Sequence, residues 1–125
     1  MADGPMLVGV DGFVRGEEYA LQYGATVILG RSRSCGISLR RCKAWLALDP
    51  EKRNAEKDFQ TVSRKHCRVS YYDAVGIEVE DLSSNGTFVN GERTVRIVIR
   101  DLRERSYELL LGTRERFRLE WRSQG

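Results

Sequence analysis

The sequence lacks the features that hold small proteins together without a large core. Its three cysteines, Cys35, Cys42 and Cys67, are odd in number and have no short paired spacing, so neither a disulfide framework nor a zinc finger is indicated. The start of the chain has no basic stretch followed by a long apolar run, and no segment approaches the length that crosses a bilayer. We therefore expect a reducing, cytoplasmic location, with no disulfide, metal, cofactor or membrane contact.

The chain also lacks a strong net charge. Its 21 Lys and Arg residues against 18 Asp and Glu give a net charge of +3, which is too mild to indicate nucleic acid by bulk electrostatics. With 125 residues, of which 41% are hydrophobic and 31% charged, it has the size and composition of one globular domain. Any anion site must therefore be local.

What the sequence does contain is a series of short apolar or alternating runs. They are rich in β-branched and aromatic residues, and Gly, Asn, Asp or Ser fall between them, which is typical of strands and turns. We expect strands over residues 6–10, 19–21, 26–29, 37–39, 67–72, 77–80, 87–89, 95–99, 107–111 and 116–121. The pairs Asn85-Gly86 and Asn90-Gly91 predict tight turns on either side of 87–89. This number of strands in one domain indicates an all-β sandwich or barrel.

Residues 40–61 break the strand pattern. An apolar run, 45–48, is followed by Asp49-Pro50, which predicts a turn, and then by a charged stretch, 51–58. We interpret the segment as a long inserted loop, in which 44–48 packs as a helical turn or a short strand. Loops of this length inside compact domains are uncommon and tend to be functional or disordered.

Polar residues gather at the ends of the expected strands. Gly30-Arg31 ends one strand, Ser63-Arg64-Lys65-His66 opens another, and residues 83–86 connect two more. Because the loops of a sandwich meet at its ends, an arginine, hydroxyls, an amide and backbone N–H groups can converge there. A phosphate group offers nearly two negative charges and three acceptor oxygens, which the planar fork of arginine matches. The pattern predicts a phosphate site, with Arg31 as its first candidate.

Together these motifs resemble the signature of the forkhead-associated (FHA) family, in the family's order: Gly30-Arg31, Ser63-Arg64-Lys65-His66, and the run from Asp81 to Gly91. The resemblance covers roughly residues 5–121 and implies one FHA domain at 5–122. The implied fold is an all-β, FHA-like sandwich of about eleven strands, mostly antiparallel. FHA domains read phosphorylated motifs with arginine. The resemblance thus implies a non-enzymatic module that binds phosphothreonine in a partner protein phosphorylated by a Ser/Thr kinase.

The resemblance also implies a role for each binding residue. Arg31 and Ser63 would bind phosphate oxygens, and Arg64 would contribute its backbone N–H, with a direct contact by its guanidinium left open. Ser84 would touch the phosphate or the pocket for the phosphothreonine methyl group, and Asn85 would hold the peptide backbone.

Three further residues would support the site rather than touch the ligand. His66 is expected to fix the neighbouring loops by hydrogen bonds, and Gly86 to supply a backbone geometry that a β-carbon would strain. Gly30 precedes the key arginine. Specificity beyond the phosphate would come from Arg33, Thr61, Val62 and the insertion between Arg40 and Gln60.

Two other functions, catalysis and metal binding, fit the sequence less well. Catalysis by Ser63, His66 and Asp81 is disfavoured, because residues three apart on an extended segment face opposite sides and no nucleophile-elbow or oxyanion motif is present. A metal site at His66 and Cys67 is disfavoured because adjacent strand residues also face opposite sides.

The many arginines after position 92 raise the hypothesis of a nucleic-acid surface. Acidic residues are interleaved with them, so a mixed-charge solvated sheet face is favoured instead. A phosphate-independent interaction scaffold, using a sheet face or the insertion, stays open as the main alternative.

Overall fold

The computed structural model describes residues 3–73 and 76–123, which form two β-sheets packed face to face. The strands are β1 (Gly4–Asp11), β2 (Glu18–Ala20), β3 (Thr26–Gly30), β4 (Ile37–Ser38), β5 (Cys67–Asp73), β6 (Gly76–Asp81), β7 (Thr87–Val89), β8 (Glu92–Thr94), β9 (Arg96–Ile99), β10 (Tyr107–Leu111) and β11 (Glu115–Arg122). The helices are short: η1 (Gly12–Val14), η2 (Leu39–Arg41), α1 (Lys43–Leu46), α2 (Pro50–Asn54) and α3 (Lys57–Gln60). None of these helices is long and apolar enough to cross a bilayer.

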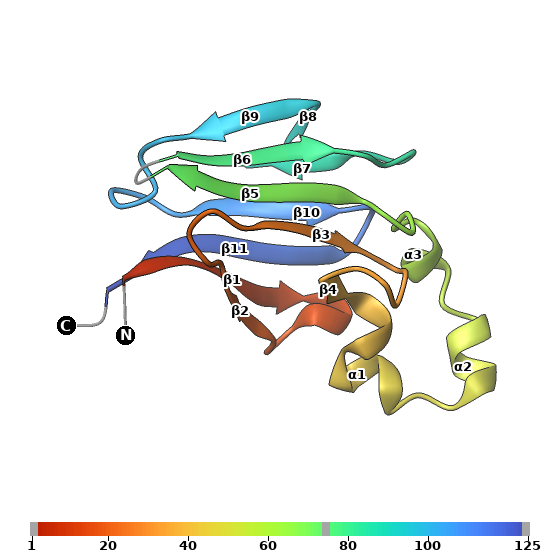
Figure 1. The fold of residues 1–125 in the computed structure, drawn as a ribbon. Helices are drawn as coiled ribbons and strands as arrows, with labels where there is room; N and C mark the ends of the chain where they lie inside the picture. Colours follow the sequence, from red (N-terminus) through yellow and green to blue (C-terminus); the bar gives the residue numbers. More distant parts are fainter. Residues whose placement is uncertain (1–2, 74–75, 124–125) are drawn as a thin grey trace.

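One sheet has six strands in the order β2-β1-β11-β10-β7-β8, and the other has five in the order β4-β3-β5-β6-β9. The ladders are antiparallel except for the short parallel pair β3 and β4. The helices of residues 39–60 gather at the end of the sandwich where β3 ends and β5 begins (Figure 1). The expected all-β sandwich of about eleven strands is confirmed.

Two local differences from the expected strands have simple causes. The strand β8 was not expected, because Glu92, Arg93 and Thr94 are polar and largely exposed; it forms when Asn90 (φ 51°) and Gly91 (φ 82°) reverse the chain onto β7. The expected strand 37–39 ends one residue early, since the Ser38 hydroxyl accepts a hydrogen bond from the Arg40 N–H and caps η2.

The inserted segment contains the helical turn that was expected within 44–48, and two further helices that were not expected. It contains η2 and three short α-helices, and it is tied to the sandwich by aromatic packing. Trp45 and Phe59, both buried, stack with ring centroids 3.7 Å apart, and Phe13 meets both rings edge-on. Such pairs add to the stabilisation that burial itself supplies. The insertion is therefore an extension of the core that borders one end of the sheets.

Candidate functional site

The Arg31 and Ser63 segments lie side by side as a short continuation of the β3–β5 ladder. The Arg31 N–H donates to the Ser63 carbonyl (3.0 Å), and the Ser32 N–H donates to the Arg64 carbonyl (3.1 Å). Gly30 makes this approach possible, because a β-carbon there would lie 2.2 Å from the Arg64 carbonyl oxygen. Backbone contact thus brings together two motifs that are 32 residues apart in sequence.

The Arg31 guanidinium is held in place without an acidic partner. Its Nε donates to the Val62 carbonyl, and within the described residues no carboxylate forms an ion pair with Arg31, Arg40 or Arg64. Burial and then the nearby charges of Arg40 and Arg64 lower the pKa of Arg31. These charges repel one another, so a bound anion would relieve an unfavourable interaction that the protein maintains in its absence.

His66 joins the loops on either side of the site. Its ring is fully buried; Nδ1 accepts the Ser63 N–H (3.0 Å), and Nε2 lies 2.8 Å from the Gly86 carbonyl. Because Nδ1 is an acceptor, the proton must be on Nε2, which donates to Gly86. Burial lowers the pKa of His66 and keeps the ring neutral. The histidine therefore links the Ser63 and Gly86 loops through two hydrogen bonds.

The carboxylate of Asp81 organises the loop that carries Ser84 and Asn85. One oxygen, Oδ1, accepts hydrogen bonds from the Ser83 N–H (3.0 Å), the Ser83 hydroxyl (2.5 Å) and the Thr87 hydroxyl (2.8 Å). Burial alone would raise the pKa of Asp81, but these hydrogen bonds outweigh it and leave the pKa below its usual value. Asp81 thus acts as an anchor for the loop.

Ser84 and Asn85 are exposed and face the Ser63 segment. The Ser84 N–H donates to the Ser63 hydroxyl (3.2 Å), and the Asn85 Nδ2 donates to the Thr61 carbonyl (2.9 Å). The Ser63 hydroxyl, acting as an acceptor here, keeps its own O–H to donate to an anion. Arg64 is exposed next to them. The structure therefore brings all five predicted binding residues to one end of the sandwich.

The arrangement disfavours nucleophilic catalysis by Ser63, His66 and Asp81. Both ring nitrogens of His66 are used by backbone groups, and neither contacts the Ser63 hydroxyl. The Asp81 carboxylate binds hydroxyls rather than the imidazole. Cys67 is buried, and burial raises the pKa of its thiol, which disfavours the thiolate that a metal or a nucleophilic role requires.

The arginines near the C-terminus are mostly engaged in ion pairs. Carboxylates contact Arg96, Arg100, Arg105, Arg114, Arg116, Arg118 and Arg122. Of the others, the Arg103 guanidinium lies 4.5 Å from the centre of the Trp121 ring. A surface whose cations are already paired offers little net charge to a nucleic-acid backbone.

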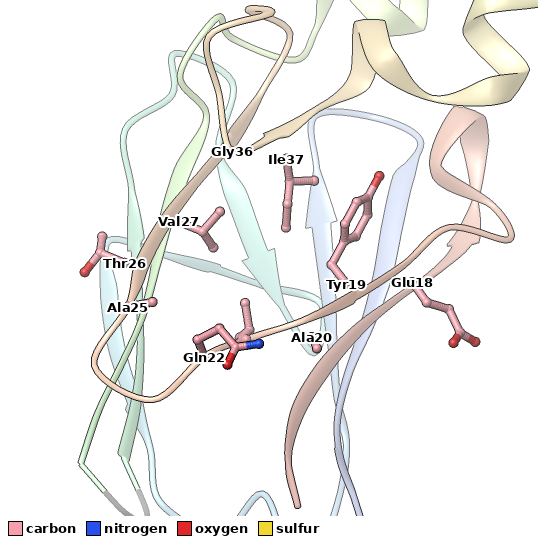
Figure 2. Close-up of a pocket in the computed structure, with 10 residues that line it drawn as sticks. Glu18, Tyr19, Ala20, Gln22, Ala25, Thr26, Val27, Gly36 and Ile37 are labelled. Carbon is pink, nitrogen blue, oxygen red and sulfur yellow. The ribbon is translucent and has the colours of Figure 1, made fainter. Parts of the chain in front are cut away.

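Another groove lies away from this site and is mainly apolar. It has a volume of about 480 Å³ and opens between β2 and the strands β3 and β4. Figure 2 shows Tyr19, Val27 and Ile37 pointing into it, while the Glu18 carboxylate points away. Its lining contains no basic side chain, so it does not suit a phosphate group.

Several residues at the site were given no such role by sequence reasoning. Thr61 accepts the Asn85 amide, and its hydroxyl accepts the Thr113 N–H (3.1 Å). Arg93 donates to the Ser84 carbonyl (3.5 Å). Asp81 was weighed only as a catalytic acid. The contacts of Thr61 join segments far apart in sequence, so no local motif predicts them.

Comparison with known protein families identifies the family of this chain. The family model of the FHA domain matches residues 27–107. No curated protein sequence matches the chain.

Solved structures with the same fold include the FHA domain of the CT664 protein from Chlamydia trachomatis, with 23% identity and a TM-score of 0.66 over 93% of this chain and 95% of that one. The FHA domain of an Arabidopsis thaliana hypothetical protein has 22% identity and a TM-score of 0.69 over 99% and 90% of the two chains. The FhaA FHA domain, complexed with the intracellular domain of Rv3910, has 23% identity and a TM-score of 0.61 over 95% and 100%. Since the family model covers more than half of the sequence, this chain belongs to the FHA domain family.

Proposed function

We propose that this domain, spanning residues 5–122, binds phosphothreonine in a partner protein through Arg31, Ser63, Arg64, Ser84 and Asn85. FHA domains are interaction modules and are generally non-enzymatic. One similar structure, with 23% identity, comes from an analysis of phosphothreonine-dependent FHA domain interactions. The partner would be a protein phosphorylated by a Ser/Thr kinase.

The observation that carries the proposal is the unpaired cluster around Arg31. The Arg31 guanidinium donates to the Val62 carbonyl and is close to the positive charges of Arg40 and Arg64. The Arg31 backbone pairs with the segment that carries the Ser63 hydroxyl. Such a pre-oriented cation needs little reorganisation to form charge-assisted hydrogen bonds with a phosphate. Ser84 and Asn85 would then contact the peptide around the phosphorylated residue.

The test is fluorescence polarisation with pools of phosphothreonine peptides and with matched phosphoserine and unphosphorylated pools. We expect binding to phosphothreonine, and we expect Arg31→Ala to weaken it about 10- to 100-fold, because hydrogen bonds to charged groups contribute about 1.5–3 kcal/mol. Arg31→Lys keeps the charge but loses the planar fork, so it should restore only part of the affinity.

The matched control is Arg118→Ala, which removes an exposed arginine that pairs with Glu120 on the β11 strand. Its affinity should equal that of the wild type. Unchanged affinity in Arg31→Ala would show that the pocket assignment is wrong. A partner that binds equally well after phosphatase treatment would instead favour a phosphate-independent scaffold.

A further inference from the structure

A second basic pocket lies beside the Arg31 cluster and has not been assigned a role. It has a volume of about 250 Å³ and is lined by Arg33, Arg40, Trp45, Pro50, Arg53, Asn54 and Gln60. Three guanidinium groups and two amides thus surround one concavity, and none of its lining residues is acidic.

Two residues that line this pocket are close in sequence to the proposed phosphothreonine site. Arg33 follows Arg31 by two residues, and Gln60 leads directly into the segment that carries Val62 and Ser63. The charge of Arg40 also contributes to the lowered pKa of Arg31. The two pockets therefore belong to one electropositive surface at the end of the sandwich.

Two of its arginines are held in fixed positions. The Arg40 guanidinium lies 5.9 Å from the Trp45 ring centroid and 5.4 Å from that of Phe59. Arg53 donates to the carbonyls of Trp45 (3.2 Å) and Leu46 (3.0 Å). Because the aromatic pair is buried in the core, it provides a rigid base for both cations.

The acidic residues of the insertion do not neutralise these arginines. Glu56 and Asp58 face Arg114 instead, at 3.4 Å and 3.9 Å. Within the residues that the structure describes, Arg33, Arg40 and Arg53 form no ion pair. Glu56 and Asp58 thus pair with Arg114, while Arg40 and Arg53 line the pocket without an acidic partner.

We propose that this pocket, called here the insertion pocket, binds a second anion on the same peptide. Since an extended chain advances about 3.4 Å per residue, four residues of peptide reach about 14 Å from the phosphothreonine, and we place the anion within that reach. It is either a carboxylate side chain or a second phosphate, and Arg33, Arg40 and Arg53 bind it. The ligand class is thereby narrowed from any phosphothreonine peptide to an acidic or multiply phosphorylated one. The inference rests on the proposed function.

The experiment compares a singly phosphorylated peptide with neutral flanks against a set in which one position, from four residues before to four after the phosphothreonine, carries Glu or a second phosphothreonine. At the best position we expect about tenfold tighter binding, which corresponds to about 1.4 kcal/mol. The two substituents separate a carboxylate ligand from a phosphate ligand. A gain below about twofold at every position would overturn the proposal.

The variants are Arg33→Gln and Arg40→Gln, each alone and together. Arg33 is exposed and Arg40 is half-buried, so the first variant tests the pocket without disturbing the aromatic stack. We expect Arg33→Gln to keep its affinity for the neutral peptide within about threefold. The double variant should lose most of the tenfold gain, measured against its own affinity for the neutral peptide. The charge-matched control, Lys52→Gln, removes an exposed cation of α2 that does not line the pocket. An equal loss of the gain in Lys52→Gln would mean that only net charge matters and would refute the site.

A second readout keeps the insertion pocket testable if no phosphothreonine peptide binds and the proposed function fails. Inorganic phosphate is titrated while the indole N–H signal of Trp45 is followed by NMR, in the wild type, in Arg31→Ala and in the double variant. A saturable shift that persists in Arg31→Ala and disappears in the double variant supports the pocket. No shift, or the same shift in the double variant, rejects it.

Discussion

Replacing His66 with alanine should damage both stability and recognition, although His66 is not expected to touch the ligand. The substitution leaves the Ser63 N–H and the Gly86 carbonyl without their partners and removes a ring that is fully buried. Each lost partner costs about 1–3 kcal/mol, and the cavity adds to this, so we expect the free energy of unfolding to fall by about 3–5 kcal/mol. Small domains are stable by only about 5–15 kcal/mol, so the loss would be severe.

The assay is urea unfolding followed by tryptophan fluorescence, with linear extrapolation to water. His66→Gln should lose only about half as much as His66→Ala, since an amide can satisfy one of the two backbone groups but cannot bridge both. Lys65→Ala, at the exposed neighbouring residue, is the control and should change the free energy of unfolding by less than about 0.5 kcal/mol. A loss below about 1 kcal/mol in His66→Ala would refute the bridging role.

The remaining predictions concern pH and the supports of the site. Folding lowers the pKa of His66 from its usual 6.5. The contribution of the neutral ring to stability is therefore complete above about pH 6.5 and is lost as the pH falls toward the pKa of the folded state. In urea titrations at several pH values, His66→Ala should lack this pH-dependent loss of stability. Gly30→Ala should destabilise the domain by about 1–3 kcal/mol or more, since the β-carbon meets the Arg64 carbonyl, and it should also abolish phosphopeptide binding. Asp81→Ala should cost about 2–4 kcal/mol and increase hydrogen exchange at the Ser83 and Gly86 amides, whereas Asp101→Ala, far along the chain, should leave those amides protected.

The order of the strands in sequence was largely predictable, because most strands here bury one face. Runs such as 67–72 and 116–121 alternate apolar and polar residues, and burial follows that alternation. The strand β8 escaped prediction because it is a polar edge strand, defined by the preceding Asn-Gly turn rather than by a core face. Edge position, not propensity, explains the miss.

Of the helices of the insertion, only the turn at α1 was anticipated, as one of two alternatives, since each helix is only four or five residues long and covers little more than one turn. A 3.6-residue period cannot be detected over so short a length. The helices α1 and α3 are stabilised instead by Trp45 and Phe59, which pack on Phe13 from a distant part of the chain. Tertiary packing thus decides a conformation that local sequence leaves open.

Some features of the candidate site could likewise be predicted from the sequence, and others could not. The residues that carry short motifs, such as Arg31 and Ser63, could be identified from sequence because their order and spacing resemble the family signature. The anchoring role of Asp81, the contact between Thr61 and Asn85, and the basic insertion pocket depend on which segments meet in space. Sequence pattern indicates chemistry, but the neighbours of each group come from the fold.

The pairing of the first and last strands determines how this domain can be attached to anything else. Gly4 lies opposite Arg122, so β1 enters and β11 leaves at the same corner. That corner lies at the end of the sandwich away from α3 and the end of β3 (Figure 1). A tag, a surface linker or a fused protein joined at either terminus would therefore be attached at the end of the sandwich opposite the proposed site. The loops that carry the proposed site lie at the opposite end of the sandwich, away from such an attachment (Figure 1).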